Sequence, residues 1–265
     1  MTGWHFGRLL FRCNICGAAC EEQAQNLERE VPSCASCGST VRARAILHML
    51  STELYGRSVA LPDFPVAKHI RGIGLSDSHV YTGRLAERFD YTNTFLDREP
   101  RLDITDVDPS LTGTADFVIA SDVFEHVSPP VSRAFHNLRR LLKPGGVLLF
   151  SAPYTNSAGA MTVEHFPDLY DFEILPDTGG KPRLRNVTAT GAVQFYDDLV
   201  FHGGDGQTLE MRVFSETSLV QEFLAAGFEA PHIYTNSDFE HGIVWNCSWS
   251  LPMAVRPAAT TRRES

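Results

Sequence analysis

Residues 117–151 carry the pattern that most constrains the fold of this chain: two short apolar runs with one amphipathic segment between them. The runs at 117–120 and 147–151 have the length and composition of buried strands. Between them, apolar side chains recur at helical spacing, and the sequence KPGG at 143–146 ends that helix. A strand, a helix and a second strand make a crossover unit, so this stretch predicts an α/β fold with a parallel sheet.

The rest of the chain continues this alternation, which predicts a doubly wound, mostly parallel sheet. The link between the second and third predicted strands is short, so the helix usual at that place is expected to be missing. Residues 152–214 show no long helical period and are too long for an ordinary connection, so we predict an inserted lid there. The further predicted strands are 66–70, 91–96, 101–104, 228–235 and 248–256, and the further predicted helices are 41–55 and 216–226.

Four cysteines form two close pairs, Cys13-x2-Cys16 and Cys34-x2-Cys37, with seventeen residues between the pairs. This spacing is typical of a tetrahedral zinc site made by two knuckle turns. The surrounding segment has too few apolar residues for a core of its own, so we expect a structural zinc ion to fold it. A nucleic-acid-binding ribbon, a thiol redox centre and a site for another metal remain alternatives.

The remaining two cysteines, Cys20 and Cys247, are expected to be plain thiols. The predicted domains are a zinc-binding module with its connecting helix at 1–56 and an α/β domain at 57–256, with a disordered tail at 257–265.

The formal net charge of the 265 residues is -9, which disfavours nucleic acid as the main substrate and favours a small molecule. No apolar run is long enough to span a membrane and no leader peptide is evident, so a soluble, cytoplasmic protein is expected. The oligomeric state is left open.

Two segments of the α/β region resemble a known family. Residues 115–127 read ADFVIASDVFEHV and residues 137–148 read NLRRLLKPGGVL. They resemble the fourth and fifth strand motifs of class I S-adenosylmethionine-dependent methyltransferases, and the resemblance extends over 66–151 and again over 214–256. It implies a Rossmann-like fold and S-adenosylmethionine as the cofactor. We expect O- or N-methylation of a small polar acceptor, such as a sugar or a natural-product intermediate.

The resemblance also implies which residues bind the cofactor. The segment 69–77, HIRGIGLSD, matches the family's glycine-rich turn at two glycines, but Ile70 replaces the usual acidic residue and Ser76 stands where a third glycine is common. Strand ends in an open parallel sheet meet at a ligand crevice, where the matched residues are expected to lie. The implied cofactor-binding residues are Gly72, Gly74, Asp97, Asp103, Ile104, Ser121 and Asp122.

Two histidines in the insertion, His165 and His202, are the candidate catalytic residues. An imidazole with a pKa near neutrality can take a proton from an acceptor as the methyl group moves. Glu164 or Asp197 is the candidate partner that orients the base. The alternative for each histidine is a structural residue in a loop. Glu125 and His126 belong to the family motif and are expected to have a structural or pocket-wall role.

Two other functions remain open. In a nucleic-acid methyltransferase, the zinc module would hold RNA through a basic face made by Arg8, Arg12, Arg42 and Arg44, although Arg42 and Arg44 are expected on a solvated helix face. In an inactive scaffold protein, the altered glycine turn would no longer bind the cofactor. Equilibrium binding of S-adenosylmethionine would separate the scaffold from both enzymes.

Overall fold

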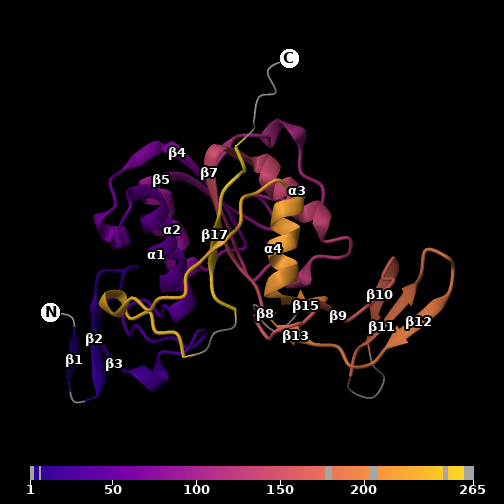
Figure 1. Cartoon of the computed structure of the whole chain (residues 1–265), viewed down its shortest axis with the longest axis horizontal. Helices are drawn as coiled ribbons and strands as arrows, with labels where there is room; N and C mark the ends of the chain where they lie inside the picture. The colour runs from indigo at the N-terminus through magenta and orange to yellow at the C-terminus, as the bar shows by residue number, and fades with distance from the viewer. Residues whose placement is uncertain (1–2, 6, 177–180, 203–207, 247–249, 260–265) are drawn as a thin grey trace.

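The computed structural model describes residues 3–5, 7–176, 181–202, 208–246 and 250–259. Its centre is a six-stranded sheet in the order β16-β17-β7-β6-β4-β5 (Figure 1). The four strands from β5 to β7 are parallel, and β17 and β16 are antiparallel additions at one edge. The predicted fold class is therefore confirmed. The strands are β4 (Ala67–Leu75), β5 (Phe89–Thr94), β6 (Ala115–Ser121), β7 (Leu142–Ser151), β16 (His232–Ile233) and β17 (Met253–Val255).

Helices cover both faces of this sheet. Strand β6 shows this, because its successive side chains point to opposite faces and are buried on both. Val118 packs in the same buried cluster as α3 (Ser132–Leu141) and α4 (Glu216–Ala225). Its neighbour Ile119 packs in the cluster that contains α1 (Val41–Tyr55) and α2 (His79–Arg88). Figure 1 shows these two helix pairs on opposite sides of the sheet.

The predicted helices at 41–55 and 216–226 form almost as expected. Thr40 caps α1 by accepting a hydrogen bond from the Ala43 amide, and Gly56 ends the helix with φ of 69°. The predicted strand at 101–104 does not form, apart from one bridge between Phe95 and Arg101. The side chain of Asp103 accepts hydrogen bonds from the Thr105 amide and hydroxyl, and this turn prevents an extended backbone.

The segment KPGG at 143–146 differs in detail from a free turn. It begins two residues after the end of α3 and belongs to the start of β7, where the register against β6 shifts between Ala115 and Phe117. Gly145 has φ of 78°, a backbone conformation that favours glycine. The helix thus ends just before this segment rather than within it, and the segment joins the sheet as an irregular strand.

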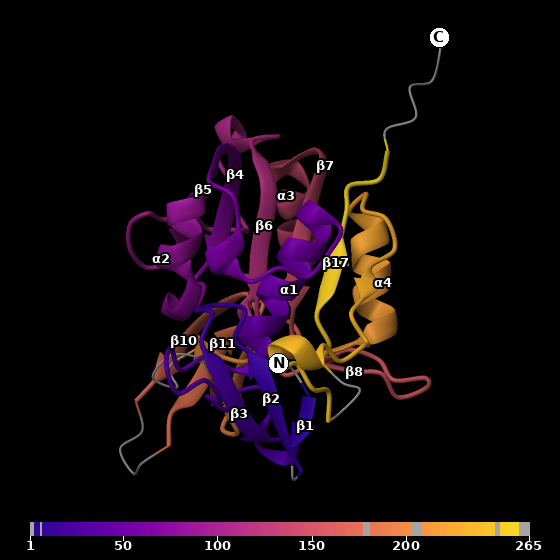
Figure 2. The same ribbon diagram turned by 90° about the vertical axis from the view of Figure 1, so that its left-hand side faces the viewer.

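The N-terminal segment forms a small antiparallel sheet followed by the two cysteine loops. The sheet contains β1 (Gly3–His5), β2 (Arg8–Arg12) and β3 (Ala19–Gln23). Figure 2 shows it at the end of the large sheet where the parallel strands finish. Cys13, Ile15 and Cys34 are buried in the same cluster as α1 and the large sheet, so this segment shares a core with the rest of the protein.

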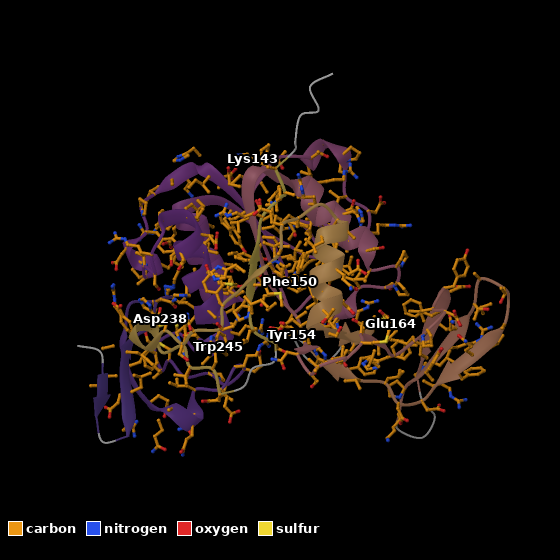
Figure 3. The ribbon with its side chains drawn as sticks, in the orientation of Figure 1. Lys143, Phe150, Tyr154, Glu164, Asp238 and Trp245 are labelled. Carbon is orange, nitrogen blue, oxygen red and sulfur yellow. The ribbon has the colours of Figure 1, made fainter. Side chains whose placement is uncertain are left out.

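A polar network fixes the C-terminal region against the N-terminal half. The Asp238 carboxylate accepts hydrogen bonds from His241 and Ser58, and it lies 2.9 Å from the ring of His48 on α1. Figure 3 shows Asp238 beside the N-terminal segment. No helix within the described ranges is both long and apolar enough to cross a membrane.

The insertion is built from short strands. Its outer part is an antiparallel meander of β10 (Asp171–Leu175), β11 (Arg183–Val187) and β12 (Val193–Tyr196), which projects from the body in Figure 1. Its inner part forms a separate three-stranded sheet in the order β8-β15-β9, in which β15 pairs with both other strands. The remaining strands are β8 (Tyr154–Thr155), β9 (Val163–Glu164), β13 (Phe201–His202), β14 (Thr208–Leu209) and β15 (Arg212–Ser215).

Candidate active site

The strand order changes direction between β4 and β6, and this point defines the expected ligand crevice. From β4 the chain moves through α2 to β5 at one edge, whereas from β6 it moves through α3 to β7 on the other side. The loops after Leu75 and Ser121 therefore diverge and leave a gap at the carboxyl ends of the two strands. Ser121 and Asp122 lie there. Gly72 and Gly74, which were expected in a turn after a strand at 66–70, lie instead within β4, where they pair with both β5 and β6.

Arginines of the N-terminal segment contact the end of β6. Both Nη atoms of Arg29 donate to the Asp122 carboxylate at 2.8 and 2.7 Å, and Arg42 donates to Ser121 Oγ at 2.8 Å. Burial opposes ionisation of Asp122, but the charges of Arg29 and Arg42 outweigh it and hold the pKa of that carboxyl well below its usual range. Asp122 is therefore a carboxylate that is already paired within the protein.

The two predicted glycines are required by side-chain packing. A Cβ on Gly72 would lie 2.1 Å from the ring of Phe117, and a Cβ on Gly74 would lie 2.0 Å from the Tyr91 hydroxyl. The protein's own side chains thus fill the space beside both backbone positions. This packing explains why neither position tolerates a larger residue. The explanation does not require a bound cofactor.

Asp77, which is not among the predicted site residues, is a buried carboxyl in the loop that follows β4. Its Oδ2 accepts a hydrogen bond from the Tyr91 hydroxyl, while Oδ1 is buried without a hydrogen-bond partner in the described part of the chain. Burial raises the pKa of Asp77 to about 7. Its position just after the glycine turn was the only signal in the sequence.

The predicted cofactor residues do not all line one cavity. A cavity of about 70 Å³ is lined by Arg42, Ser78, Tyr81 and Ser121, among others. A larger one, of about 320 Å³, is lined by Asp103 and neighbouring acidic residues. Two other predicted cofactor residues line neither cavity. Ile104 is buried in the core, and its carbonyl accepts a hydrogen bond from Asn137. Asp97 is exposed.

The two predicted catalytic histidines meet at one carboxylate. His165 Nε2 lies 2.8 Å from Glu210 Oε1, and His202 Nε2 lies 2.6 Å from Glu210 Oε2. Burial alone would raise the pKa of Glu210, but hydrogen bonds from His202 and His165 lower it. Glu210 is 8% exposed and lies 45 positions after His165 and eight positions after His202 in the sequence.

The expected partners of these histidines are engaged elsewhere. Glu164, labelled in Figure 3, accepts from Arg212 Nε at 2.7 Å, and Asp197 pairs with Arg183 on the meander. The prediction that Glu164 or Asp197 orients the base is therefore wrong. Glu210 takes this position because residues 209–212 return from the insertion between the two histidine-bearing segments.

Glu125 and His126 lie next to the group formed by His165, Glu210 and His202. They belong to the short 3₁₀ helix η4 (Phe124–His126), which follows β6. Glu125 is fully buried, and burial together with the charge of Asp122 raises the pKa of its carboxyl well above the usual range. The ring of His126 packs against that of His202, with centroids 4.8 Å apart. Burial lowers the pKa of His126.

Arg212 fixes η4 to the returning strand. Its buried guanidinium donates to the carbonyls of Phe124 and Val127, and the Met211 amide donates to the carbonyl of Glu125 at 2.7 Å. These bonds satisfy the polar backbone of the turn and hold it rigidly. The end of β6 and the insertion therefore form one polar site.

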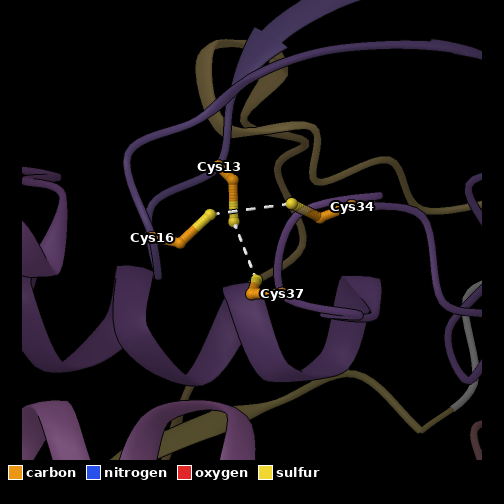
Figure 4. A group of neighbouring side chains, drawn as sticks. All are labelled: Cys13, Cys16, Cys34 and Cys37. Carbon is orange, nitrogen blue, oxygen red and sulfur yellow. Dashed lines mark hydrogen bonds between the residues drawn. The ribbon is translucent and has the colours of Figure 1, made fainter.

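The four cysteines predicted as zinc ligands come together. The sulfur atoms of Cys13 and Cys37 are 3.7 Å apart, as are those of Cys16 and Cys34, and all four lie within 4.8 Å of one another. Figure 4 shows them pointing into a common space. Tetrahedral Zn–S bonds of about 2.3 Å would place the sulfur atoms roughly 3.8 Å apart, so the arrangement fits zinc.

Cys20 lies closer to this group than expected for an unrelated thiol. Its sulfur is 3.5 Å from that of Cys34. Cys247, the other predicted plain thiol, lies outside the described residues.

The four arginines proposed for a basic face do not form one. Arg8 pairs with Glu21 and Arg12 with Asp63. Arg44 is fully buried, where it donates to the carbonyls of Ser39 and Gly242, and Arg42 pairs with Glu30 and Asp122. The expectation that Arg42 and Arg44 lie on a solvated helix face is wrong, because α1 packs that face against the cysteine loops and the crevice.

Comparisons with known proteins found several similarities. Part of a highly reducing polyketide synthase of Hypocrea jecorina is 28% identical over 134 residues, which is 50% of this chain but only 5% of that protein. The structure of a Burkholderia thailandensis 1,6-didemethyltoxoflavin-N1-methyltransferase covers 82% of this chain and 78% of its own, with a TM-score of 0.47 and 13% identity. The sugar N-methyltransferase KedS8 from Streptoalloteichus covers 83% of this chain and 89% of its own, with a TM-score of 0.44 and 18% identity.

A family model described as a methyltransferase domain matches residues 78–233, more than half of the chain. The match begins at the N-cap of α2 and includes η4, the insertion and α4. It agrees with the enzyme class indicated by the strand motifs, and the chain therefore belongs to the methyltransferase domain family.

Proposed function

We propose that the protein transfers a methyl group from S-adenosylmethionine to an oxygen or nitrogen of a small polar acceptor, such as a sugar or a natural-product intermediate. The observation that carries the proposal is the group formed by His165, Glu210 and His202 over the end of β6. It provides proton-accepting imidazoles at the edge of a methyltransferase sheet where ligands bind.

The residues at the crevice fit the amino-acid end of the donor. Ser78 lines the smaller cavity at the start of α2, and a helix N-terminus is suited to bind a carboxylate. The unpartnered Oδ1 of Asp77 is suited to accept a hydrogen bond from an ammonium group. We assign Asp103 and Ile104 to the adenine end, as the family resemblance implies, and retain Gly72, Gly74, Asp97, Ser121 and Asp122 as proposed members of the site.

The chemistry demanded of the protein is modest. A sulfonium methyl group needs an acceptor that is in line, close and carries a free electron pair. Glu210 accepts an N–H bond from each imidazole through Nε2, which leaves Nδ1 of each ring to take the acceptor's proton. The proposed catalytic residues are therefore His165 and His202, oriented by Glu210.

We also propose one structural zinc ion bound by Cys13, Cys16, Cys34 and Cys37. The sulfur spacing supports it, and so does the lack of an independent hydrophobic core in the loops that carry the cysteines. Free thiolate ligands of this kind suit a reducing compartment, which supports a cytoplasmic location.

A nucleic-acid substrate is the less favoured alternative. The net charge is -9, and each of the four arginines considered for a basic face is paired or buried. A small molecule fits both observations better.

The first test is calorimetric titration of the purified protein with S-adenosylmethionine. Binding is expected, and Asp103→Ala should weaken it by about 1–3 kcal/mol if the adenine amino group loses its partner. Asp90→Ala, at an exposed position on β5, is the matched control and should bind as the wild type does. No binding by the wild type would favour an inactive scaffold.

The second test identifies the acceptor. The protein is incubated with a metabolite extract and methyl-labelled S-adenosylmethionine, and labelled products are found by mass spectrometry. A labelled small molecule supports the proposal, whereas label found only in RNA would support the nucleic-acid alternative.

A further inference from the structure

Three side chains with metal-binding atoms converge beside the proposed catalytic group. Glu125, His126 and His202 each offer one ligand atom, and these atoms all lie within 4.8 Å of one another. Glu125 Oε1 is 3.7 Å from His126 Nε2. Two of the residues come from η4 and the third from β13, so the group forms only when the insertion folds over the sheet.

Hydrogen bonds fix the protonation of both rings. His126 Nδ1 lies 2.8 Å from the carbonyl oxygen of Leu209, which can only accept, so Nδ1 carries the proton and Nε2 keeps its electron pair. His202 Nε2 donates to Glu210, so Nδ1 of that ring keeps its electron pair. Each histidine thus has a carbonyl or carboxylate partner on one nitrogen and an available electron pair on the other, which is the arrangement usual in metal-bound histidines.

Glu125 lacks the partners that a buried carboxyl group needs. Its side chain is 0% exposed, and neither oxygen has a hydrogen-bond partner in the part of the chain that the structure describes. Leaving such a group unpaired is costly, because burial removes the water that would otherwise bind it. A cation held between Glu125 and the two imidazoles would remove this cost.

We propose that Glu125, His126 and His202 bind a divalent transition-metal ion, separate from the zinc ion at the four cysteines. Two imidazoles and one carboxylate favour zinc, iron, cobalt or manganese over magnesium or calcium, which prefer oxygen donors. Three protein ligands leave open positions for a water molecule or an acceptor oxygen.

This proposal deepens the proposed methyl transfer and rests on it for the ion's role. An acceptor hydroxyl bound to the ion would have a lower pKa. His202 is then a ligand, and His165 is the base. The acceptor O–H bond breaks with its proton passing to His165, the O–CH₃ bond forms, and the S–CH₃ bond breaks. The sulfur keeps the electron pair of that bond, which yields S-adenosylhomocysteine.

The binding test uses the full chain with its structural zinc in place. Cobalt(II) is titrated into the protein and followed by calorimetry and visible absorption. We expect one added equivalent with weak bands and no thiolate-to-cobalt charge transfer, because no cysteine contributes to this site. Strong charge-transfer bands, or no uptake of cobalt, would overturn the proposal.

Three variants locate the ion. His202→Ala, at a partly exposed position where folding is not at risk, and Glu125→Gln should each abolish the added equivalent. Glu210→Gln removes a partner of a ligand and should weaken binding roughly 10–100-fold. His136→Ala is the control, since His136 is exposed on α3, and should bind cobalt as the wild type does. Equal binding by wild type and His202→Ala would overturn the assignment.

The ion's role is tested separately from the methyl transfer itself. Dialysis against a mild chelator gives protein with an empty second metal site. If this protein methylates its acceptor as fast as the metal-loaded protein does, the proposed catalytic role of the ion is overturned. If cobalt binds as expected but S-adenosylmethionine does not, the metal site stands and the proposed function fails.

Discussion

Arg29 and Asp122 lie 93 positions apart in the sequence and form a two-pronged ion pair at the mouth of the crevice. Arg29 belongs to the loop between the two cysteine pairs, and Asp122 follows the last residue of β6. The pair therefore connects the predicted zinc module directly to the site where the donor and the acceptor are expected. Folding of the cysteine loops and order at the crevice should depend on each other.

We first predict that Arg29→Ala lowers the free energy of unfolding by about 2 kcal/mol. Removing one partner of a fully buried ion pair costs about 3–5 kcal/mol, and partial exposure of Arg29 (12%) and Asp122 (19%) reduces this. Urea denaturation measures the change. Arg12→Ala is the control, because Arg12 and Asp63 form an exposed pair that should contribute less than about 1 kcal/mol. Equal effects of the two substitutions would contradict the structural importance of Arg29.

The second prediction concerns the number of cysteine ligands. Protein purified without chelator should contain one tightly bound zinc ion that survives Cys20→Ser and is lost in Cys37→Ser. Cys20 is 3.5 Å from Cys34 but is not one of the four predicted ligands, so it distinguishes a four-cysteine site from a larger one. Elemental analysis of the three proteins gives the answer. Wild-type protein without zinc would rule out the structural ion.

The third prediction is a pH dependence of stability due to Asp77, whose pKa is raised to about 7 by burial. In the unfolded chain an aspartate has a pKa of about 3.9, so the folded protein binds an extra proton between these values. Asp77 therefore destabilises the fold increasingly as the pH rises from about 4 to about 7. Asp77→Asn removes this penalty, and its advantage over the wild type should be larger at pH 8 than at pH 5.

The measurement is urea denaturation of both proteins at the two pH values. Asp90→Asn, an exposed aspartate on β5, serves as the control and should shift stability equally at both. An advantage of Asp77→Asn that is the same at pH 5 and pH 8 would show that the carboxyl does not titrate in this range.

Local sequence patterns predicted most of the fold. The helix of α1 was evident because Thr40 and Gly56 mark its ends, and the strands β6 and β7 were evident from their apolar runs. The failed strand at 101–104 shows the limit of this reasoning. Its composition suited a strand, but the bonds from Asp103 to its own backbone favoured a turn.

The candidate site was only partly predictable, because its partners come from distant segments. His165 and His202 could be named by residue type, but Glu210 could not, since only the fold of the insertion places it between them. Arg29 gave no signal at all in the sequence. A polar residue's chemistry can be recognised locally, whereas its partner depends on the tertiary structure.

The last prediction separates the two histidines by their effects on catalysis. His165→Ala, measured with saturating S-adenosylmethionine and an identified acceptor, should lower kcat by roughly 10²–10⁴ because the general base is lost.

His202→Ala should also lower kcat, but its effect should include loss of the second metal equivalent, which His165→Ala retains. His136→Ala, on the exposed side of α3, controls for the loss of an imidazole that contacts neither group. If neither His165→Ala nor His202→Ala lowers kcat by more than a few-fold, the proton leaves by another route. If both lower it but both also retain the metal, Glu210 positions two bases and the ion is not bound by His202. Measuring kcat and metal content on the same preparations therefore assigns each imidazole a single role.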